Sequence, residues 1–348
     1  MKIAVAVSGG TDSLFSLILL KEQGHDVFAV HAFFLPPDDK AHETVAGLQS
    51  RCDALGVPLH VLDLHKEFQQ QVIDPFIAAY ATGKTPNPCA LCNPTMKFGL
   101  LFDRAKALGA SHVATGHYAR IQGEGADARL IRGTDPVKDQ SYFLSLVPQE
   151  RLAKAIFPLD SWCKTDVRSE LEKRGIVPPL PSDSQEICFV PGDDYCAFLE
   201  HRSLEPLPGP GKIILEDGSS VGRHNGIWRY TLGQRRGIGV AWKEPLYVIA
   251  KNAEDNTLTV GPKSSLPIAC CQLREVNILV PQDQWPEKLY AQTHYRQKAR
   301  PVEVELTDGG LELRFTEAHT RPAPGQIGAL YTEDGTVLAG GVISHSCR

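Results

Sequence analysis

The sequence lacks any apolar run of about 18 residues or more, which is the length that a membrane-spanning helix requires. It also lacks, ahead of its first strand-like segment, the basic region and the hydrophobic segment that are typical of an export signal. These absences exclude an integral membrane protein and argue against export. We therefore expect a cytoplasmic protein with no membrane partner.

The cysteines lack the pattern of a disulfide scaffold. There are nine of them, an odd number, which in a chain without an export signal favours a reducing compartment and a role in chemistry or metal binding. Only one Cys-x-x-Cys pair is present, Cys89 and Cys92. Without a second pair, the spacing does not predict a structural zinc site, although a redox dithiol stays open.

The composition itself is ordinary for a globular protein of two or three domains, with 348 residues, 42% hydrophobic and 22% charged. A net charge of −5 alone argues against a nucleic-acid partner, but the basic residues gather in two windows. Residues 201–240 hold six Lys or Arg against three Asp or Glu, and residues 286–301 hold four against one. This asymmetry indicates a face that meets a polyanion, and ordinary surface variation is the alternative.

A glycine-rich loop, Ser8–Ser13 (SGGTDS), follows the first apolar segment and precedes an apolar stretch at 14–20. This order predicts a strand, a tight turn and a helix. Glycines let the backbone approach an anion closely, and a helix N-terminus offers N–H donors to phosphate. A turn that merely begins a helix shares part of the pattern, but the complete string favours a phosphate site. Because the loop lacks a Gly-Lys-Ser/Thr ending, kinase-type transfer of a terminal phosphate is disfavoured.

The first half of the chain alternates apolar strands with helices, which predicts a parallel sheet covered on both faces. We expect strands at 3–7, 27–33, 59–64 and 112–115, and helices near 41–55, 68–80, 94–109, 149–156 and 164–174. Ligands of such sheets bind beyond the carboxyl ends of the strands, where Ser8–Ser13 falls. Leu35, just past the second strand, is a candidate wall of an adenine pocket, or a core residue.

The second half changes character after Gly175. Closely spaced Gly and Pro turns from Pro206 onward, with short β-rich runs between them, predict small antiparallel β domains. A second β unit is expected from about Leu273 to the end, with alternating faces in strands such as 302–306.

Cys92 and Cys188 are the candidates for thiol chemistry. Cys92 follows two prolines that stiffen a loop, and this loop is expected to open a helix. A helix N-terminus lowers the pKa of a thiol and makes it more nucleophilic. Taken alone, any cysteine is more often an inert small hydrophobe.

Six motifs, in the order SGGTDS, PNPxxxCN, ATGHYAR, KDQSYFL, ICFV and YTLGQRRG, resemble those of the tRNA-specific 2-thiouridylases over nearly the whole chain. These enzymes replace the position-2 oxygen of the wobble uridine of certain tRNAs by sulfur. The resemblance implies an α/β fold with a PP-loop ATP-binding catalytic domain at 1–180. It implies a linker with the second catalytic cysteine and a small central tRNA-binding domain at 181–262, and a C-terminal antiparallel β-barrel at 263–348.

The resemblance also implies partners and residue roles. ATP and Mg²⁺ would serve adenylation of the uridine oxygen, with Asp12 helping to place Mg²⁺, and a sulfur relay protein or a cysteine desulfurase would supply sulfur. Cys188 would carry a persulfide that attacks the activated ring carbon or releases sulfide near it, and Cys92 would close a Cys92–Cys188 disulfide. The implied ATP-binding residues are Ala6, Val7, Ser8, Gly9, Gly10, Thr11, Asp12, Ser13, Leu35 and Gly116. The implied tRNA-binding residues are Asn87, Pro88 and Cys89 around the flipped uridine, with His117, Lys138, Asp139, Gln140, His294, Tyr295 and Gln326.

The chain departs from this family at two positions. Cys89 stands where the family usually has an Asp proposed to assist proton transfer, and a thiol with an unperturbed pKa of about 8.5 is not an equivalent base. His294 stands where the family usually has Arg, which weakens a bidentate phosphate contact. Cys89, Cys92 and Cys188 also form a set of three thiols that would suit a four-iron–four-sulfur cluster with one open iron. Cluster and disulfide chemistry both stay open at this point.

Two other functions fit parts of the sequence. An amidating enzyme of the PP-loop superfamily would use the same loop but would not need Cys92 or Cys188. A catalytically inactive tRNA-binding protein would need neither the loop nor the cysteines, yet both are present together. The leading hypothesis is ATP-dependent 2-thiolation of the wobble uridine of tRNA.

Overall fold

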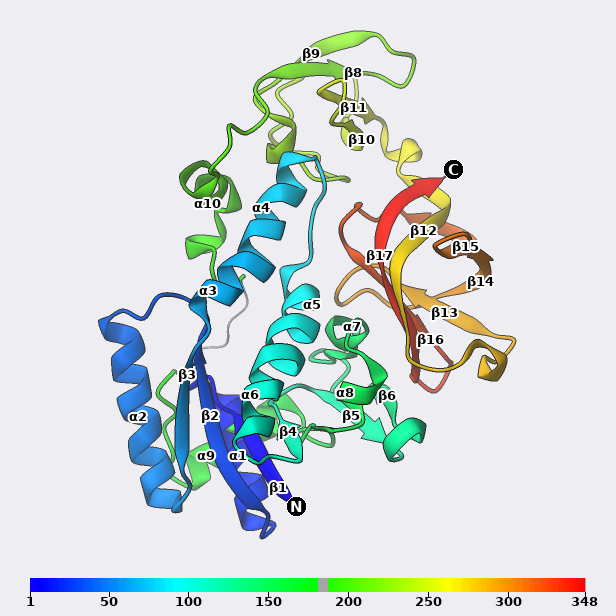
Figure 1. Cartoon of the computed structure of the whole chain (residues 1–348). Helices are drawn as coiled ribbons and strands as arrows, with labels where there is room; N and C mark the ends of the chain where they lie inside the picture. The colour runs from blue at the N-terminus through cyan, green and yellow to red at the C-terminus, as the bar shows by residue number, and fades with distance from the viewer. Residues whose placement is uncertain (181–186, 348) are drawn as a thin grey trace.

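The computed structural model describes residues 1–180 and 187–347, so residues 181–186 of the expected linker lie outside the described residues. Figure 1 shows a helix-covered sheet, a small mixed sheet and a barrel. The predicted fold class, α/β with a parallel-sheet domain followed by β-rich units, is confirmed. No helix within the described ranges is long and apolar enough to cross a membrane.

The N-terminal domain is built on a five-stranded sheet in which every neighbouring pair is parallel. Strand β1 lies in the middle, and its side chains alternate, with Ile3 and Val5 in one core and Ala4 in the other. Burial on both faces explains the continuous apolar pattern of this strand. In order across the sheet, the strands are β3 (Leu59–Asp63), β2 (Asp26–Phe33), β1 (Lys2–Ala6), β4 (His112–Ala114) and β7 (Ala155–Ile156).

Helices cover both faces of this sheet (Figure 1). Helices α1 and α2 share the core of Ile3 and Val5, and α9 packs on α1. The helices between Phe68 and Ala105 share the core of Ala4. The helix bounds are α1 (Thr11–Glu22), α2 (Asp39–Leu55), α3 (His65–Phe68), α4 (Asp74–Ala81), α5 (Pro88–Cys92), α6 (Phe102–Ala107), α7 (Ser141–Leu144), α8 (Gln149–Leu152), α9 (Lys164–Lys173) and α10 (Tyr195–Arg202). Two π-helical segments, Gln69–Ile73 and Asn93–Leu101, join α3 to α4 and α5 to α6.

The helix that carries Cys92 begins earlier than the sequence predicts. The expected start near residue 94 is wrong, because α5, the π-helical segment and α6 run on from one another from Pro88. Pro88 lies at the first helical position, where its missing N–H costs nothing. The side-chain oxygen of Asn87 accepts a hydrogen bond from the N–H of Ala90 at 3.1 Å and caps the helix. The expected helix at 149–156 is also shorter, since Ala155–Ile156 forms the edge strand β7.

The second half contains two β units, as predicted. The central sheet has the order β10-β11-β8-β9, and the C-terminal strands close into a six-stranded barrel. The expectation of a purely antiparallel central sheet is wrong, because β8 and β11 are separated in the chain by two other strands and pair in parallel. A hairpin of the first domain, β5 (Ala119–Gln122) and β6 (Arg129–Arg132), contacts this barrel. The central strands are β8 (Gly211–Ile214), β9 (Ser220–His224), β10 (Tyr247–Asn252) and β11 (Thr257–Gly261). The barrel strands are β12 (Pro267–Ile278), β13 (Leu289–Gln292), β14 (Arg300–Thr307), β15 (Gly310–Thr320), β16 (Ile327–Tyr331) and β17 (Val337–Cys347). Cys270 on β12 is disulfide-bonded, which the cysteine pattern did not predict.

The barrel is fastened to the loop that leads into α5. Thr85 donates its backbone N–H to the carbonyl of Pro324 at 2.8 Å. The side-chain amide of Gln326 donates to the carbonyls of Thr85 at 2.9 Å and Pro86 at 3.2 Å. A barrel segment distant in sequence therefore holds the backbone immediately before Asn87.

Candidate active site

The loop Ser8–Ser13 connects β1 to the N-terminus of α1, as predicted. Gly9 has a φ of +90°, a conformation that L side chains rarely adopt. Ser13 closes the loop, because its Oγ donates to the carbonyl of Gly10 at 3.0 Å and accepts from the N–H of Ser8 at 3.1 Å. Gly10 stands at the N-cap and brings no side chain to the first-turn N–H groups of α1. The geometry suits a phosphate at this position.

The carboxylate of Asp12 is held by two groups from distant segments. Its Oδ1 accepts a hydrogen bond from the hydroxyl of Tyr118 at 2.8 Å and pairs with the ammonium of Lys164 at 2.6 Å. Lys164 is buried at the start of α9. The sequence does not predict Lys164 as a site residue, because no local pattern marks a lysine that is 152 residues from its partner. The buried cation Lys164 therefore lies beside the predicted phosphate site of the loop Ser8–Ser13.

Gly116 packs directly on the first turn of α1. A Cβ atom at this position would lie 2.9 Å from the backbone carbon of Asp12 and 3.0 Å from the nitrogen of Ser13. Backbone atoms cannot yield as a flexible side chain can, so only glycine fits here. Leu35, which is 36% exposed, follows β2 at the same edge of the sheet. Contact of Gly116 and Leu35 with a nucleotide stays a prediction.

The three candidate cysteines come together. Cys89 and Cys92 lie in α5, and Cys188 precedes Phe189, whose ring packs against Phe76 with centroids 5.1 Å apart. Electrostatic interactions connect Cys92 with both Cys188 and Cys89. Cys89 and Cys188 are solvent-exposed, whereas Cys92 is buried beneath the surface. The fold therefore joins a helix of the first domain to a segment that is 96 residues further along the chain.

Burial raises the pKa of each of these thiols. The pKa of Cys92 is about 12 and that of Cys188 about 11, chiefly because the surrounding protein disfavours the thiolate and secondarily because each thiol lies near another. Although Cys89 is exposed, the protein around it raises the pKa of its thiol too. The expectation that a helix N-terminus lowers the pKa of Cys92 is therefore wrong, because desolvation outweighs the helix dipole.

Lys97 is the cation that opposes this effect at all three cysteines. It lies five residues after Cys92 in the π-helical segment, whose hydrogen bonds span five residues, so the two share a helix face. The ammonium of Lys97 lies 3.4 Å from Nε2 of His117, and Nδ1 of His117 lies 2.7 Å from the hydroxyl of Thr115. Burial and then the charge of Lys97 hold the pKa of His117 well below its usual value. The imidazole is therefore neutral and accepts from Lys97.

Two consecutive residues link the phosphate loop to the cysteines. Gly116 touches the first turn of α1, and His117 holds Lys97 among the thiols. The family resemblance predicts roles for both residues but none for Lys97. No sequence motif could have identified Lys97 as a site residue, because its role depends on the position that Cys188 takes in the fold.

Several predicted tRNA contacts are occupied within the protein. Asp139 is buried, pairs with Arg132 at 2.8 Å and accepts from the N–H groups of Gly133 and Ser141. Gln140 accepts from the N–H of Tyr118 at 3.0 Å. His117 is buried as well. The structure gives these side chains internal partners, and their direct contact with RNA stays a prediction.

Other predicted contacts gather around α5. The ring of Tyr295 lies 4.5 Å from that of Phe143, whose carbonyl accepts a hydrogen bond from the side chain of Asn93 at 2.9 Å. His294 beside it is exposed, and Lys138 lies half-buried three residues before α7. Gln326 holds the backbone before Asn87 from the other side. Barrel residues thus flank the helix of Cys89 and Cys92 at both of its ends.

The three cysteines do not fit a metal cluster as they are placed. Within residues 1–180 and 187–347, no group of three or more His, Cys, Asp or Glu side chains is arranged to hold a metal ion. The raised pKa values of the three thiols also oppose the thiolate form that ligation requires. We therefore derive no step through an iron–sulfur cluster, and iron analysis of anaerobically purified protein tests this conclusion.

Replacement of Lys97 by methionine is expected to raise the pKa of Cys188 further. The substitution removes the one cation that lowers the pKa of all three thiols, so less thiolate is present at any pH below about 11. Alkylation of Cys188 by iodoacetamide, followed by mass spectrometry across pH 7–10, should slow several-fold. Lys97→Arg keeps the charge and should stay close to the parent; equal rates for the methionine variant and the parent would contradict this role.

Comparisons with known proteins cover the whole chain. Residues 1–192 match the family described as tRNA methyl transferase HUP domain, residues 197–262 its PRC-barrel domain, and residues 268–343 the aminomethyltransferase beta-barrel domain. A tRNA-specific 2-thiouridylase of Oleidesulfovibrio alaskensis is 55% identical over 99% of both chains. Similar enzymes of Nitratidesulfovibrio vulgaris, strain Miyazaki F, and Lawsonia intracellularis are 54% and 47% identical, again over 99% of each chain.

Proposed function

The chain belongs to the tRNA-specific 2-thiouridylase family and is therefore a tRNA sulfurtransferase, and we propose that it thiolates the wobble uridine in two steps that share one site. The observation that carries this proposal is the pair Gly116 and His117. One touches the phosphate loop and the next holds Lys97 among the cysteines. Activation and sulfur transfer can then occur on one uridine without release.

The first step uses ATP bound at Ser8–Ser13. The position-2 oxygen of the uridine attacks the α-phosphorus, the bond to the β-phosphate breaks, and pyrophosphate leaves. First-turn N–H groups of α1 and the ammonium of Lys164 would stabilise the charge on the phosphates. A single carboxylate, Asp12, together with phosphate oxygens suits Mg²⁺, which would neutralise the leaving pyrophosphate. To bind the ion, Asp12 would exchange its contact with Lys164.

The second step transfers sulfur from Cys188. A persulfide on Cys188 attacks the activated ring carbon, the carbon–oxygen bond breaks, and AMP leaves with the oxygen. The thiol of Cys92 then attacks Sγ of Cys188, breaks the sulfur–sulfur bond and forms a Cys92–Cys188 disulfide, which frees the 2-thiouridine. A reducing thiol must reopen the disulfide after each turnover. Lys97 would stabilise the anionic sulfur at each stage.

Cys89 changes the proton chemistry of this site. Its pKa is raised by the surrounding protein, so Cys89 is protonated at neutral pH and does not act as a carboxylate does. In the two described ranges of the chain, no ion pair engages the ammonium of Lys97. Its positive charge lowers the pKa of the thiols of Cys92 and Cys188.

The sulfur donor is a persulfide-carrying protein, either a sulfur relay protein or a cysteine desulfurase. Cys188 is exposed, so a donor protein can reach it, whereas Cys92 is buried. The two cysteines thus differ in solvent accessibility. The donor protein can reach Cys188, and the buried Cys92 acts only in the release of the product.

Reconstitution with unmodified tRNA, ATP and a persulfide donor tests this function. We expect 2-thiouridine in the nucleoside digest, with AMP and pyrophosphate formed in step with it. An amidating enzyme would instead consume ammonia and ATP without a persulfide. An inactive tRNA-binding protein would bind tRNA without forming AMP.

Replacement of Cys92 by serine is expected to trap a covalent tRNA–protein adduct. Without the buried thiol, the sulfur–sulfur bond between Cys188 and the uridine is not cleaved, so turnover should fall by about 10³-fold or more. Denaturing gels of labelled tRNA should show a shifted band that dithiothreitol removes. A variant that releases thiolated tRNA at the parental rate would show that free sulfide is the attacking species.

A further inference from the structure

A basic loop of the central domain has no role in the chemistry described above. It runs from Gly233 to Leu246, between β9 and β10, and includes the end of the YTLGQRRG motif. Gln234 folds it, because its side-chain oxygen accepts from the N–H of Thr231 at 3.0 Å and its amide donates to the carbonyl of Arg236 at 2.9 Å. Gly237 and Gly239 both have a φ of +77° and turn the chain sharply. The loop is therefore a defined structure that displays Arg235 and Arg236.

The charged and aromatic side chains of this loop face solvent. Arg235, Arg236 and Lys243 are exposed, and Trp242 is 44% exposed. Among the described residues, no hydrogen bond or ion pair engages the side chains of these three cations. Glu244 brings one negative charge against three positive ones. An exposed indole together with three cations that have no partner in the described chain offers both stacking and charge to a ligand, which makes this surface a candidate for binding.

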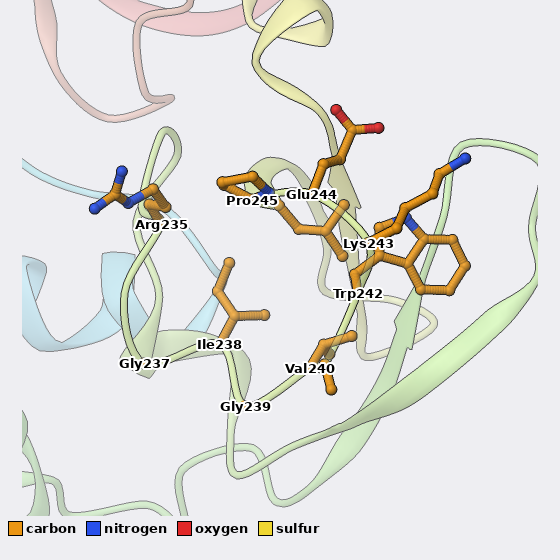
Figure 2. A pocket seen from close by; sticks show the side chains of 11 residues that line it. Arg235, Gly237, Ile238, Gly239, Val240, Trp242, Lys243, Glu244 and Pro245 are labelled. Atoms are coloured by element: carbon orange, nitrogen blue, oxygen red, sulfur yellow. The ribbon is translucent and has the colours of Figure 1, made fainter.

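The loop surrounds a hollow of about 710 Å³. Figure 2 shows Arg235 on one side of it and Trp242 with Lys243 on the other, with Ile238 between them. Pro245 and Val240 add apolar surface to the lining. Cations on the rim and apolar groups within suit a ligand that has both anionic and flat apolar parts.

The loop also begins next to the active-site region. It follows the turn Ile227–Arg229, which packs on the C-terminal end of α4. A Cβ atom on Gly83, just past α4, would lie 3.5 Å from the side chain of Ile227. From Gly83 the chain leads through Thr85 to Asn87 and the cysteine helix. A strand bound along the loop would therefore lie beside the approach to the target uridine.

We propose that the loop Gly233–Leu246 binds the tRNA strand, with Arg235 and Arg236 on phosphates and Trp242 stacked on a base. This inference rests on the proposed function, since it names a second contact for the same substrate. Arginine forks pair with phosphate oxygens, and an indole face stacks on any base. An acidic protein would also meet the arginines, but the exposed indole and the hollow favour a nucleic acid over a peptide carboxylate.

The test measures the affinity of the full-length protein for unmodified substrate tRNA by fluorescence anisotropy across a KCl series. Arg235→Ala/Arg236→Ala should weaken binding on the order of tenfold and reduce the slope of log Kd against log salt by roughly 1.5. Trp242→Ala should weaken binding roughly fivefold or more, and Trp242→Phe should restore it.

A matched control is Lys212→Ala/Arg223→Ala, which removes two exposed cations from the same domain. These residues pair across β8 and β9, and Arg223 alternates with Gly222, which faces Val240 of the loop. The control should keep the parental affinity and salt slope. Equal losses in both double variants would overturn the assignment to the loop, and thermal melting of each variant checks its fold.

Four further outcomes separate the possibilities. AMP formation at saturating tRNA should be unchanged in the Arg235→Ala/Arg236→Ala variant, which supports a binding role. Parental tRNA affinity combined with loss of persulfide-dependent turnover would overturn the inference and assign the loop to the sulfur donor. If the parent protein thiolates tRNA and the loop variants bind tRNA normally, only the inference about the loop Gly233–Leu246 is overturned. If the parent protein binds no tRNA, both this inference and the proposed function are overturned.

Discussion

Replacement of Cys188 by serine is expected to abolish formation of 2-thiouridine while AMP is still formed from ATP. The oxygen of serine cannot carry a sulfane sulfur, so the loss should be on the order of 10³-fold or more. Adenylation should continue, because we expect the phosphate groups of ATP to contact the loop Ser8–Ser13 and not this thiol. The measurement pairs mass analysis of tRNA nucleosides with release of labelled AMP from the same reactions.

A suitable control for Cys188→Ser is Cys196→Ser. Cys196 lies on α10, eight residues further on, is half-buried and has a pKa raised by burial, yet its charge interactions are with Asp194, Glu200 and Arg229 rather than with Lys97. The control should thiolate tRNA normally. Thiolated tRNA from the Cys188→Ser protein would remove Cys188 from the mechanism, and consumption of ammonia and ATP without thiolation would point to amidating chemistry instead.

Asp12→Asn is expected to eliminate AMP formation while tRNA affinity stays nearly unchanged. The amide keeps the oxygen that accepts hydrogen bonds from Tyr118 and Lys164. It loses the negative charge that pairs with the ammonium of Lys164 and would bind Mg²⁺. Loss of one charge-stabilising group of this kind costs about 10²- to 10³-fold in rate. Pyrophosphate release measured with saturating tRNA, together with anisotropy at fixed salt, reports the two properties separately.

Asp103→Asn provides the matched control for Asp12→Asn. Asp103 on α6 also pairs with a cation, Arg151, at 2.5 Å, but it is more than half exposed and takes no part in the phosphate loop. Its loss should change stability by no more than about 1 kcal/mol and leave AMP formation intact. If Asp12→Asn lowered tRNA affinity as much as AMP formation, Ser8–Ser13 would be part of the tRNA site and not an independent nucleotide site.

Local sequence patterns sufficed for the elements that depend on near neighbours. The strand Lys2–Ala6, the loop and the helix Thr11–Glu22 follow from an apolar run, two glycines and a second apolar run within about 20 residues. The closely spaced turns of the second half likewise predicted β units. The helix of Cys92 was misplaced, because Pro88 was treated as a barrier although the first helical position tolerates proline.

The groups that tune the site could not be predicted, because they act across the chain. Lys164 meets Asp12, and Lys97 meets Cys188, only after the sheet and the following segments have folded. The pKa of Cys92 also depends on burial, which a motif does not encode: the helix terminus suggested a lowered pKa, and packing raised it. The contact of Gln326 with tRNA stays a prediction, and its hydrogen bonds to the backbone of Thr85 and Pro86 also depend on the fold.

The attachment of Gln326 has a consequence for synthesis on the ribosome. The carbonyl of Pro86 accepts a hydrogen bond from a side chain 240 residues further along the chain. Since ribosomes add about 5–20 residues per second, the loop before Asn87 lacks this partner for roughly 12–48 s during synthesis. The phosphate loop and its sheet need only the first half of the chain. A nascent chain would thus become able to bind nucleotide well before Gln326 can hold the loop that we expect to receive the uridine. Incomplete chains would then bind ATP without adenylating the uridine of a tRNA.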